Sequence, residues 1–197
     1  MTISAAPHDD IYLPRPPATG SVRPVGGGLK RGLDIAVALT ALVLLAPLLC
    51  VVAALVVLTM GRPVLCRQPR AGFAGRTIDC HRFRTTLEGS ADPTAVGLLL
   101  RESGIAKLPQ LFNVLKGEMS CVGPRPLLAD EAKGGGRDAD NHLLARPGIT
   151  GEWRLATVVA GGHMPTVLDA AYADNWSMRS DIGILFKSLS AAGRSED

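Results

Sequence analysis

An uncharged apolar run from Ile35 to Met60 constrains this chain more than any other feature. The run holds 26 residues without a charged side chain. As a straight helix it would be about 39 Å long, and the hydrocarbon core of a bilayer is about 30 Å thick. A surface helix of a soluble domain has an apolar face toward the core and a polar face toward solvent, and this run lacks the polar face. The sequence therefore predicts a membrane-embedded segment.

Pro47 and the flanking charges predict how this segment enters the bilayer. Pro47 lies at the middle of the run, where its ring and missing N–H favour a break that leaves each half too short to span. Positive flanks favour the cytoplasmic side. Both flanks are basic, with Lys30, Arg31, Arg62, Arg67 and Arg70. We predict a re-entrant helix–break–helix over residues 30–60, with a single span as the alternative.

The remaining residues predict a small domain between two tails. Residues 1–29 are rich in proline and glycine, so we expect disorder there, and we expect the same of residues 191–197. The first segment also has no early apolar stretch of the kind that a signal peptide requires. Residues 61–190 are expected to form a cytoplasmic domain. It should contain short strands or a hairpin around "RAGFAGR", helices that break near Gly104 and Pro109, and amphipathic interfacial helices near the end. The predicted fold class is α+β, mostly α.

Charge and cysteine spacing exclude several functions. The net charge of +3 suits a membrane surface or a phosphate-bearing ligand, but not the basic stripe that nucleic acid requires. The cysteines form no CxxC motif and the four histidines form no cluster, so we expect free thiols and no metal site of that kind. The cysteines are Cys50, Cys66, Cys80 and Cys121.

Short motifs in a fixed order resemble the bacterial sugar transferases, the monotopic polyprenyl-phosphate phosphoglycosyl transferases of exopolysaccharide synthesis. The resemblance extends from about Lys30 to Leu189. Its motifs are "KRGLD" before the apolar run, the Arg67-Gln68 pair, "RFRT" at 82–85, "LPQLFNVLKGEMSCVGPRP" at 108–126, "RPGITGEW" at 146–153 and "NWSMRSDI" at 175–182.

The resemblance implies a reaction and a location. Such enzymes transfer a sugar-1-phosphate from a nucleotide sugar, usually UDP-linked, to undecaprenyl phosphate at the cytoplasmic face of the bacterial inner membrane. An aspartate attacks the β-phosphate, and the next residue, a glutamate, supports the step with Mg²⁺. Mg²⁺ prefers carboxylate oxygens, and it neutralises an anion that would otherwise repel the nucleophile.

The sequence departs from the family at this dyad. Residues 108–126 align without gaps, which assigns the aspartate position to Ala106 and the glutamate position to Lys107. Alanine has no nucleophile, and a lysine ammonium opposes Mg²⁺. Glu102, one helical turn before Ala106, is the candidate substitute. Residues 154–158 also differ from the Gln-Val-Ser-Gly-Arg usual after this tryptophan. We expect no cofactor, and Mg²⁺ only if the chain is active.

Anion-binding residues of the family persist. Arginine forks bind phosphate through charge-assisted hydrogen bonds, and proline and glycine fix the turn that presents such a residue; a surface ion pair is the alternative role for each arginine. The candidate residues are Arg82, Arg84, Gly123, Pro124, Arg125 and Pro126.

Three functional hypotheses remain at this point. The favoured one is a pseudoenzyme of surface-glycan synthesis that binds membrane lipid, a phosphate group such as undecaprenyl phosphate, or a protein partner such as an active homologous transferase. The alternative is an active transferase with a nucleotide sugar donor. The third is a plain membrane-anchored structural protein, which the retained "GPRP" and "RFRT" motifs disfavour.

Overall fold

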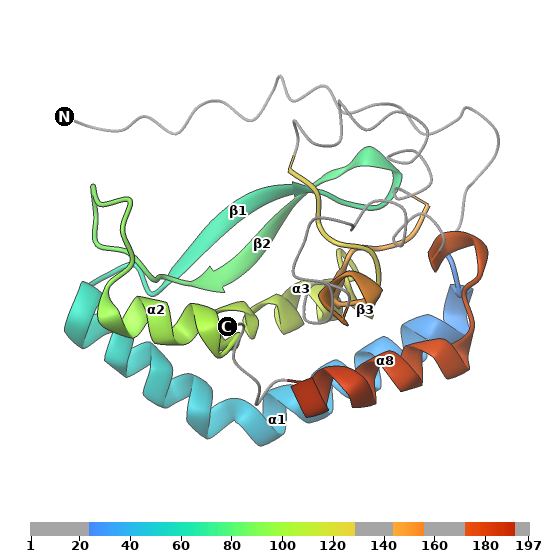
Figure 1. The fold of residues 1–197 in the computed structure, drawn as a ribbon, viewed down its shortest axis with the longest axis horizontal. Helices are drawn as coiled ribbons and strands as arrows, with labels where there is room; N and C mark the ends of the chain where they lie inside the picture. The colour runs from blue at the N-terminus through green and yellow to red at the C-terminus, as the bar shows by residue number, and fades with distance from the viewer. Residues whose placement is uncertain (1–23, 129–143, 156–171, 192–197) are drawn as a thin grey trace.

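The fold combines a long apolar helix with a small α+β domain (Figure 1). The computed structural model describes residues 24–128, 144–155 and 172–191. The expected disorder of residues 1–29 and 191–197 lies mostly outside these ranges, but residues 27–29 and residue 191 are helical, which corrects the inner bound of both tails. The elements are α1 (Gly27–Met60), β1 (Leu65–Ala71), η2 (Phe73–Gly75), β2 (Thr77–Phe83), α2 (Ala95–Glu102), η3 (Ile105–Lys107), α3 (Gln110–Lys116), β3 (Ser120–Val122), β4 (Gly148–Thr150) and α8 (Met178–Ala191). The predicted class, α+β with mostly helix, agrees with this architecture.

Helix α1 is continuous, which corrects one prediction. It begins at Gly27 and remains helical through Pro47 to Met60. The expected break is instead a bend near the middle of α1, so that both arms rise toward the same side in Figure 1. The reason is that proline removes one hydrogen bond and crowds the preceding turn, which a helix can absorb by kinking. By length and composition α1 could cross a membrane, and only 11% of its most apolar window is buried.

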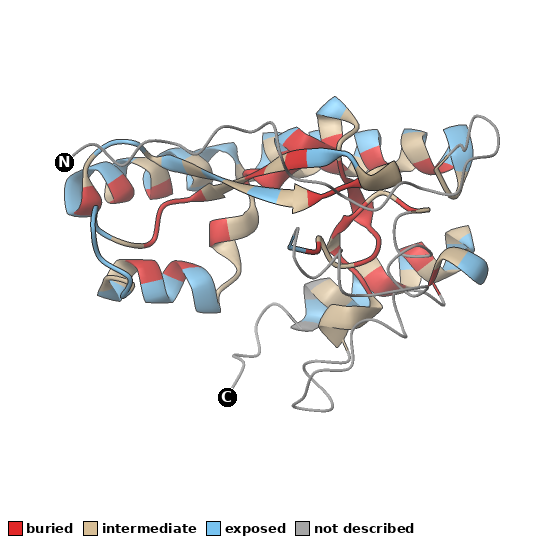
Figure 2. Cartoon of the chain, turned by 90° about the horizontal axis from the view of Figure 1, so that it is seen from above, coloured by how far each residue is buried: buried red, intermediate tan, exposed pale blue. Residues whose placement is uncertain are grey.

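Both arms of α1 pack on the same domain. The buried residues of α1 are separated by four positions at each end, and none lies between residues 38 and 52. Ala38 joins a cluster with residues of β2, α3 and β3. Val52, Val56 and Met60 join a second cluster with residues of β2 and α2 (Figure 2). The middle of α1 therefore faces away from the domain.

The predicted hairpin is confirmed as β1 and β2, which pair antiparallel from Leu65↔Phe83 to Ala71↔Thr77. Directly paired residues share a face of a hairpin. Gln68 opposes Cys80, and Cys66 opposes Arg82. This register places Gln68, Cys80 and Arg82 on one face, the face toward the cavity described below.

The predicted helical stretch after the hairpin is also confirmed, with its breaks. Helix α2 starts after Thr94, whose Oγ1 accepts a hydrogen bond from Gly97 N at 3.0 Å. It ends at Glu102, and Gly104 then adopts φ +73°, a left-handed conformation that glycine favours. Helix α3 begins after Pro109. These turns present η3 to the centre of the molecule.

The expected C-terminal amphipathic helix is α8. Ile184 is buried, whereas Ile182 and Phe186 are exposed. Strand β3 pairs in parallel with β4, and α8 packs against both. Placement of α8 at a bilayer interface remains a prediction, and the expected helical residues Val167 and Ala171 lie outside the described residues.

Candidate functional site

A cavity of about 220 Å³ lies between the hairpin, η3, α3 and the turn after β3. Its lining is strongly cationic, and none of the described residues that line it is an aspartate or a glutamate. The lining residues are Gln68, Arg70, Cys80, Arg82, Lys107, Gln110, Arg125, Pro126, Gly148, Ile149 and Trp153. We call this the cationic pocket.

The hairpin supplies two guanidinium groups to the cationic pocket. Arg82 Nη1 donates to Gln68 Oε1 at 3.0 Å, and Arg70 Nη2 donates weakly to the same oxygen at 3.4 Å. Burial lowers the pKa of Arg82 from its ordinary value, and the neighbouring Arg70 and Arg101 lower it further. Arginine stays protonated in proteins. A lowered pKa means that the cation is incompletely compensated, so an anion bound here would be favoured.

Lys107 reaches the cationic pocket from the end of η3. Its Nζ lies 5.6 Å from the ring centroid of Trp153, within the range of a cation–π contact. The indole Nε1 of Trp153 in turn donates to Gly123 O at 3.2 Å. The ammonium group is thus held beside an aromatic face that the backbone of the "GPRP" turn fixes.

Ala106, the neighbour of Lys107, faces the opposite way. It is 1% exposed and belongs to the apolar cluster that includes Val56, Phe83 and Leu100. It is absent from the lining of the cationic pocket. Successive residues of a tight 3₁₀ turn point in different directions, which separates Ala106 from Lys107. The position assigned to the family nucleophile is therefore part of the core in this chain.

Glu102 does not reach the cationic pocket either. It is the last residue of α2 and is exposed. The left-handed Gly104 separates α2 from η3, so the helical register that would align Glu102 with Ala106 does not continue. Its proposed substitution for the missing nucleophile has no support in this geometry.

An apolar cavity of about 230 Å³ adjoins the cationic pocket and shares Lys107 and Ile149 with it. It lies between α1, η3, α3, β4 and α8. Its lining residues are Val37, Ser103, Gly104, Ile105, Lys107, Leu108, Leu111, Cys121, Ile149, Thr150, Arg154, Leu185 and Ser188. The two cavities together place an apolar space and a cationic space on either side of one ammonium group.

Comparison with known proteins identifies the family. The family model "Bacterial sugar transferase" matches residues 26–195. The chain belongs to the bacterial sugar transferase family. It is 35% identical to the exopolysaccharide production protein ExoY of Sinorhizobium fredii, over 89% of this chain and 90% of that protein.

Relatives with longer chains match over the same part of this one. The undecaprenyl-phosphate galactose phosphotransferase of Salmonella typhimurium is 34% identical over 81% of this chain, which is 39% of its own length. The undecaprenyl-phosphate glucose phosphotransferase of Komagataeibacter xylinus is 36% identical over 81% of this chain and 35% of its own. This sugar transferase family member thus corresponds to almost all of ExoY and to a part of the longer relatives.

The structure brings only some of the candidate arginines together in this family member. Arg82, Arg125 and Pro126 line the cationic pocket. Arg84 does not line this pocket, and its phosphate-binding role stays a prediction. It is 8% exposed, and its guanidinium donates to two backbone carbonyls, Thr86 O at 2.8 Å and Arg62 O at 3.0 Å. Arg84 fastens the end of the hairpin to the end of α1.

Gly123 and Pro124 support the cationic pocket from behind. Gly123 N donates to Thr150 O at 3.0 Å, and Gly148 N donates to Pro124 O at 2.9 Å. A Cβ at Gly123 would lie 2.4 Å from Arg146 O, so only glycine permits this close approach. The two residues hold the turn against β4, and Arg125 follows directly after it.

Some lining residues were not among the sequence-based candidates: Gln68, Arg70, Gln110 and Trp153. For the first two a signal exists in the alternation of strand residues. Gln68 and Arg70 are two apart and therefore share a face of β1. Pairing across the turn then places Arg82 on the same face. Trp153 enters only through the tertiary packing of the segment after β4.

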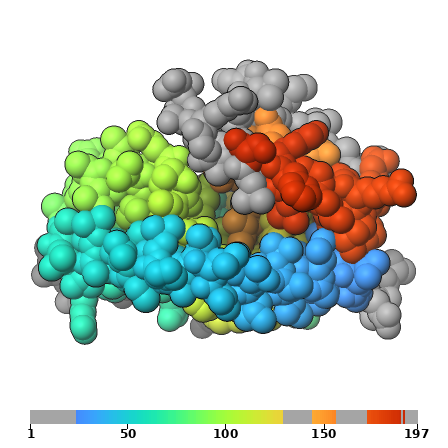
Figure 3. Space-filling model, turned by 90° about the horizontal axis from the view of Figure 1, so that it is seen from below, coloured from blue at the N-terminus to red at the C-terminus, as the bar shows by residue number. Residues whose placement is uncertain are grey.

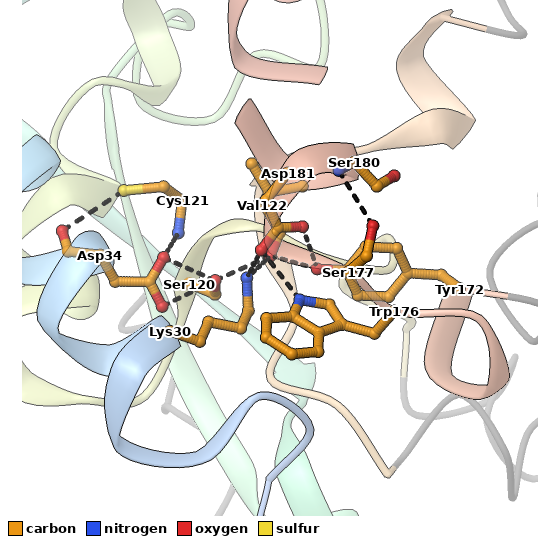
Figure 4. Close-up of polar contacts among 10 residues, drawn as sticks. All are labelled: Lys30, Asp34, Ser120, Cys121, Val122, Tyr172, Trp176, Ser177, Ser180 and Asp181. Carbon is orange, nitrogen blue, oxygen red and sulfur yellow. Dashed lines mark hydrogen bonds and ion pairs between the residues drawn. The ribbon is translucent and has the colours of Figure 1, made fainter. Parts of the chain in front are cut away.

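A buried polar cluster anchors the first turn of α1 in this family member (Figure 4). Lys30 Nζ lies 2.6 Å from Asp181 Oδ2, with exposures of 3% and 0%, and it also donates to Val122 O at 2.9 Å. Asp181 accepts further hydrogen bonds from Tyr172 OH at 2.7 Å and Trp176 Nε1 at 3.0 Å. Burial and then Asp181 raise the pKa of Tyr172, so its hydroxyl stays a donor.

Asp34, one turn later, extends this anchor to β3. Its carboxylate accepts hydrogen bonds from Ser120 Oγ at 2.8 Å and Cys121 N at 3.0 Å. Arg31 donates to the carbonyls of Val114 and Leu115 near the end of α3. The first two basic residues of the flank therefore bind the protein.

The four cysteines carry free thiols. Burial raises the pKa of Cys80 to about 11. Burial and then the nearby Asp34 raise the pKa of Cys121 to about 12. Both stay protonated near neutral pH, so Cys80 is a neutral wall of the cationic pocket.

Proposed function

We propose that this chain is a membrane-embedded sugar transferase relative that binds a phosphate-bearing group in surface-glycan synthesis without forming the covalent phosphosugar intermediate. The observation that carries this proposal is the separation of Ala106 from Lys107. Ala106 lies in the core and has no nucleophile, whereas Lys107 lines the cationic pocket. Loss of a covalent nucleophile lowers the turnover of other enzymes by several orders of magnitude. Anion binding needs only the cations that remain.

The packing of α1 supports a position on one face of the bilayer. Both arms contact the same domain, and the bend lies between them (Figure 1). Seen from below, α1 forms one continuous band across the molecule (Figure 3). A helix that crossed the membrane would place its ends on opposite sides. The outward surface of α1 exposes large apolar side chains, which require an apolar cover. They include Leu39, Val43, Leu44, Val51 and Leu58. We infer a re-entrant segment at the cytoplasmic face of the bacterial inner membrane.

The adjoining cavities support a lipid phosphate as the bound group. Several relatives carry undecaprenyl-phosphate in their names, a long isoprenoid chain joined to a phosphate. The apolar cavity opens beside α1 and α8, and Lys107 separates it from the cationic pocket. An apolar chain and its phosphate could occupy the two spaces at once. An active homologous transferase or another polysaccharide-assembly protein would then receive or supply that lipid.

An active transferase is the second candidate function. The 35% identity to ExoY over nearly the whole chain favours this candidate. The shared pocket of Arg82 and Arg125 also favours it, because the diphosphate of a nucleotide sugar would require such cations. The deciding experiment incubates the purified chain with undecaprenyl phosphate, Mg²⁺ and a panel of UDP-sugars, with heat-treated protein as the control. UMP release above that control would overturn the non-catalytic proposal. No release with any donor that an active relative accepts would support it.

Topology is tested separately by labelling. Ser4→Cys and Ser90→Cys are introduced separately into a variant whose four native cysteines are replaced by serine, and each is probed in intact and permeabilised cells with a membrane-impermeant maleimide. We expect both to react only after permeabilisation, because both would be cytoplasmic. Labelling of one of them in intact cells would show that α1 crosses the membrane.

A further inference from the structure

Mg²⁺, which the family resemblance implies, does not fit the cationic pocket. Mg²⁺ requires near-octahedral oxygen ligands, chiefly carboxylates, phosphates and water. The described lining supplies three guanidinium groups, one ammonium group and no carboxylate. Across the described parts of the chain, no group of three or more His, Cys, Asp or Glu residues could hold a metal ion. Among the described lining residues, a divalent cation placed here would meet four like charges and no carboxylate.

We propose that the cationic pocket binds a phosphate-bearing anion without a divalent metal, and that the Lys107 ammonium supplies the countercharge at that place. This inference rests on the proposed function, because it assigns the means of anion binding to the same pocket. The ligand class is a phosphate monoester, either free or as the head group of an isoprenoid lipid. Both sources present the same dianion to the protein.

The geometry gives Lys107 this role rather than that of a surface charge. Lys107 lines both cavities, which places it at the boundary between the apolar and the cationic space. The Trp153 ring lies 5.6 Å away and is tied to Gly123 O, which holds the aromatic face that restrains the ammonium. A phosphate in the cationic pocket would lie between Lys107 on η3 and the guanidinium groups of the hairpin.

The arginines complete the anion site from other elements. Arg70 and Arg82 come from the two strands, and Arg125 comes from the turn after β3. Gln68 orients the first two through its side-chain oxygen. Guanidinium forks match phosphate geometry, and lysine adds a compact point charge. The pocket therefore combines directional hydrogen-bond donors with a local positive charge. In metal-dependent phosphate sites the protein supplies the donors and the metal supplies the charge.

The test measures binding, so it does not depend on turnover. The full-length chain in lipid nanodiscs is titrated with inorganic phosphate by isothermal calorimetry, once with EDTA and once with excess MgCl₂. We expect equal affinity in both buffers. A parallel titration uses a short isoprenyl monophosphate; tighter binding than inorganic phosphate indicates a lipid head group, and equal binding indicates a free phosphate ligand.

Variants isolate the ammonium group. Lys107→Met should weaken phosphate binding about tenfold, as expected for loss of one charged hydrogen-bond partner, and Lys107→Arg should retain most of it. Lys116→Met is the matched control, because this exposed lysine of α3 does not line the cationic pocket. Its affinity should equal that of the wild type.

The outcomes separate the two proposals. Binding that requires Mg²⁺, or a Lys107→Met variant that binds as the wild type does, overturns the metal-independent role of Lys107 and leaves phosphate binding intact. Absence of binding in every buffer overturns phosphate binding itself, and with it the proposed function.

Discussion

Replacing Asp181 by asparagine should release the first turn of α1 from the domain. Asp181 is 0% exposed and accepts hydrogen bonds from Lys30, Tyr172 and Trp176. Asparagine has the same shape but no charge. The Lys30 ammonium, 3% exposed, would keep Val122 O as an acceptor and lose its counterion.

The expected loss follows from this burial. Removing one partner of a buried ion pair lowers the free energy of unfolding by about 3–5 kcal/mol, because the other charge stays uncompensated. Lys30→Met should have a similar effect by leaving the Asp181 carboxylate with neutral donors alone. The double variant should lose no more than the worse single variant, because neither charge then remains alone.

The assay is urea unfolding of the purified chain in detergent, followed by tryptophan fluorescence. Trp176 contacts Asp181 directly, so its emission reports on this site. Glu88→Gln is the matched control, since it removes the same charge from an exposed position and should change stability by less than about 0.5 kcal/mol.

A loss of about 1 kcal/mol or less for Asp181→Asn would refute the reasoning. A value that small is typical of solvent-exposed ion pairs. It would mean that water reaches the Lys30–Asp181 contact. The N-terminal arm of α1 would then not be held on the domain, and only the C-terminal arm would support a re-entrant segment.

Three further predictions test the core and the thiols. Ala106→Asp should lower the free energy of unfolding by several kcal/mol near pH 7, because burial would raise the pKa of the introduced carboxyl. This loss should shrink as the pH falls toward 5. If thermal melts at both pH values show no loss of stability, position 106 lies at the surface. Gly97→Ala should destabilise the protein by about 1–3 kcal/mol despite alanine's higher helix propensity, because its Cβ would lie 1.8 Å from Thr85 O. Gly183→Ala in α8 meets no atom within 4 Å and should stabilise the protein by up to about 1 kcal/mol. Equal effects of the two variants in chemical denaturation would contradict the packing at Gly97. Iodoacetamide at pH 8 should alkylate the half-buried Cys66 faster than Cys80 and Cys121. The pKa values of Cys80 and Cys121, about 11 and 12, keep both as thiols until far more alkaline pH. Peptide mass spectrometry measures the order of modification, and modification of Cys121 first would contradict this prediction.

Much of the site could be anticipated from local sequence. The "RAGFAGR" turn predicted the hairpin, and Gly104 and Pro109 predicted the breaks that place η3. These features depend on backbone preferences within a few residues, where glycine and proline decide the path of the chain. The motif register also identified positions 106 and 107 before any contact was known.

The roles of individual charges could not be anticipated in the same way. Arg82 and Arg84 are two residues apart, yet Arg82 lines the cationic pocket and Arg84 donates to the carbonyls of Thr86 and Arg62. Both read as phosphate-binding residues in the "RFRT" motif. Which of them meets a ligand depends on the strand end and on the neighbouring α1, and neither is visible in a short motif.

The sequence by itself determined that this chain has an apolar segment, a small mixed domain and no carboxylate at positions 106 and 107, because composition, spacing and residue identity decide those features. Only the tertiary structure decided that Ala106 is core, that Lys107 lines two cavities, and that Lys30 is buried against Asp181, 151 residues away. The reason is physical: burial, charge compensation and cavity lining arise from contacts between distant segments, and a linear pattern carries no record of which segments meet.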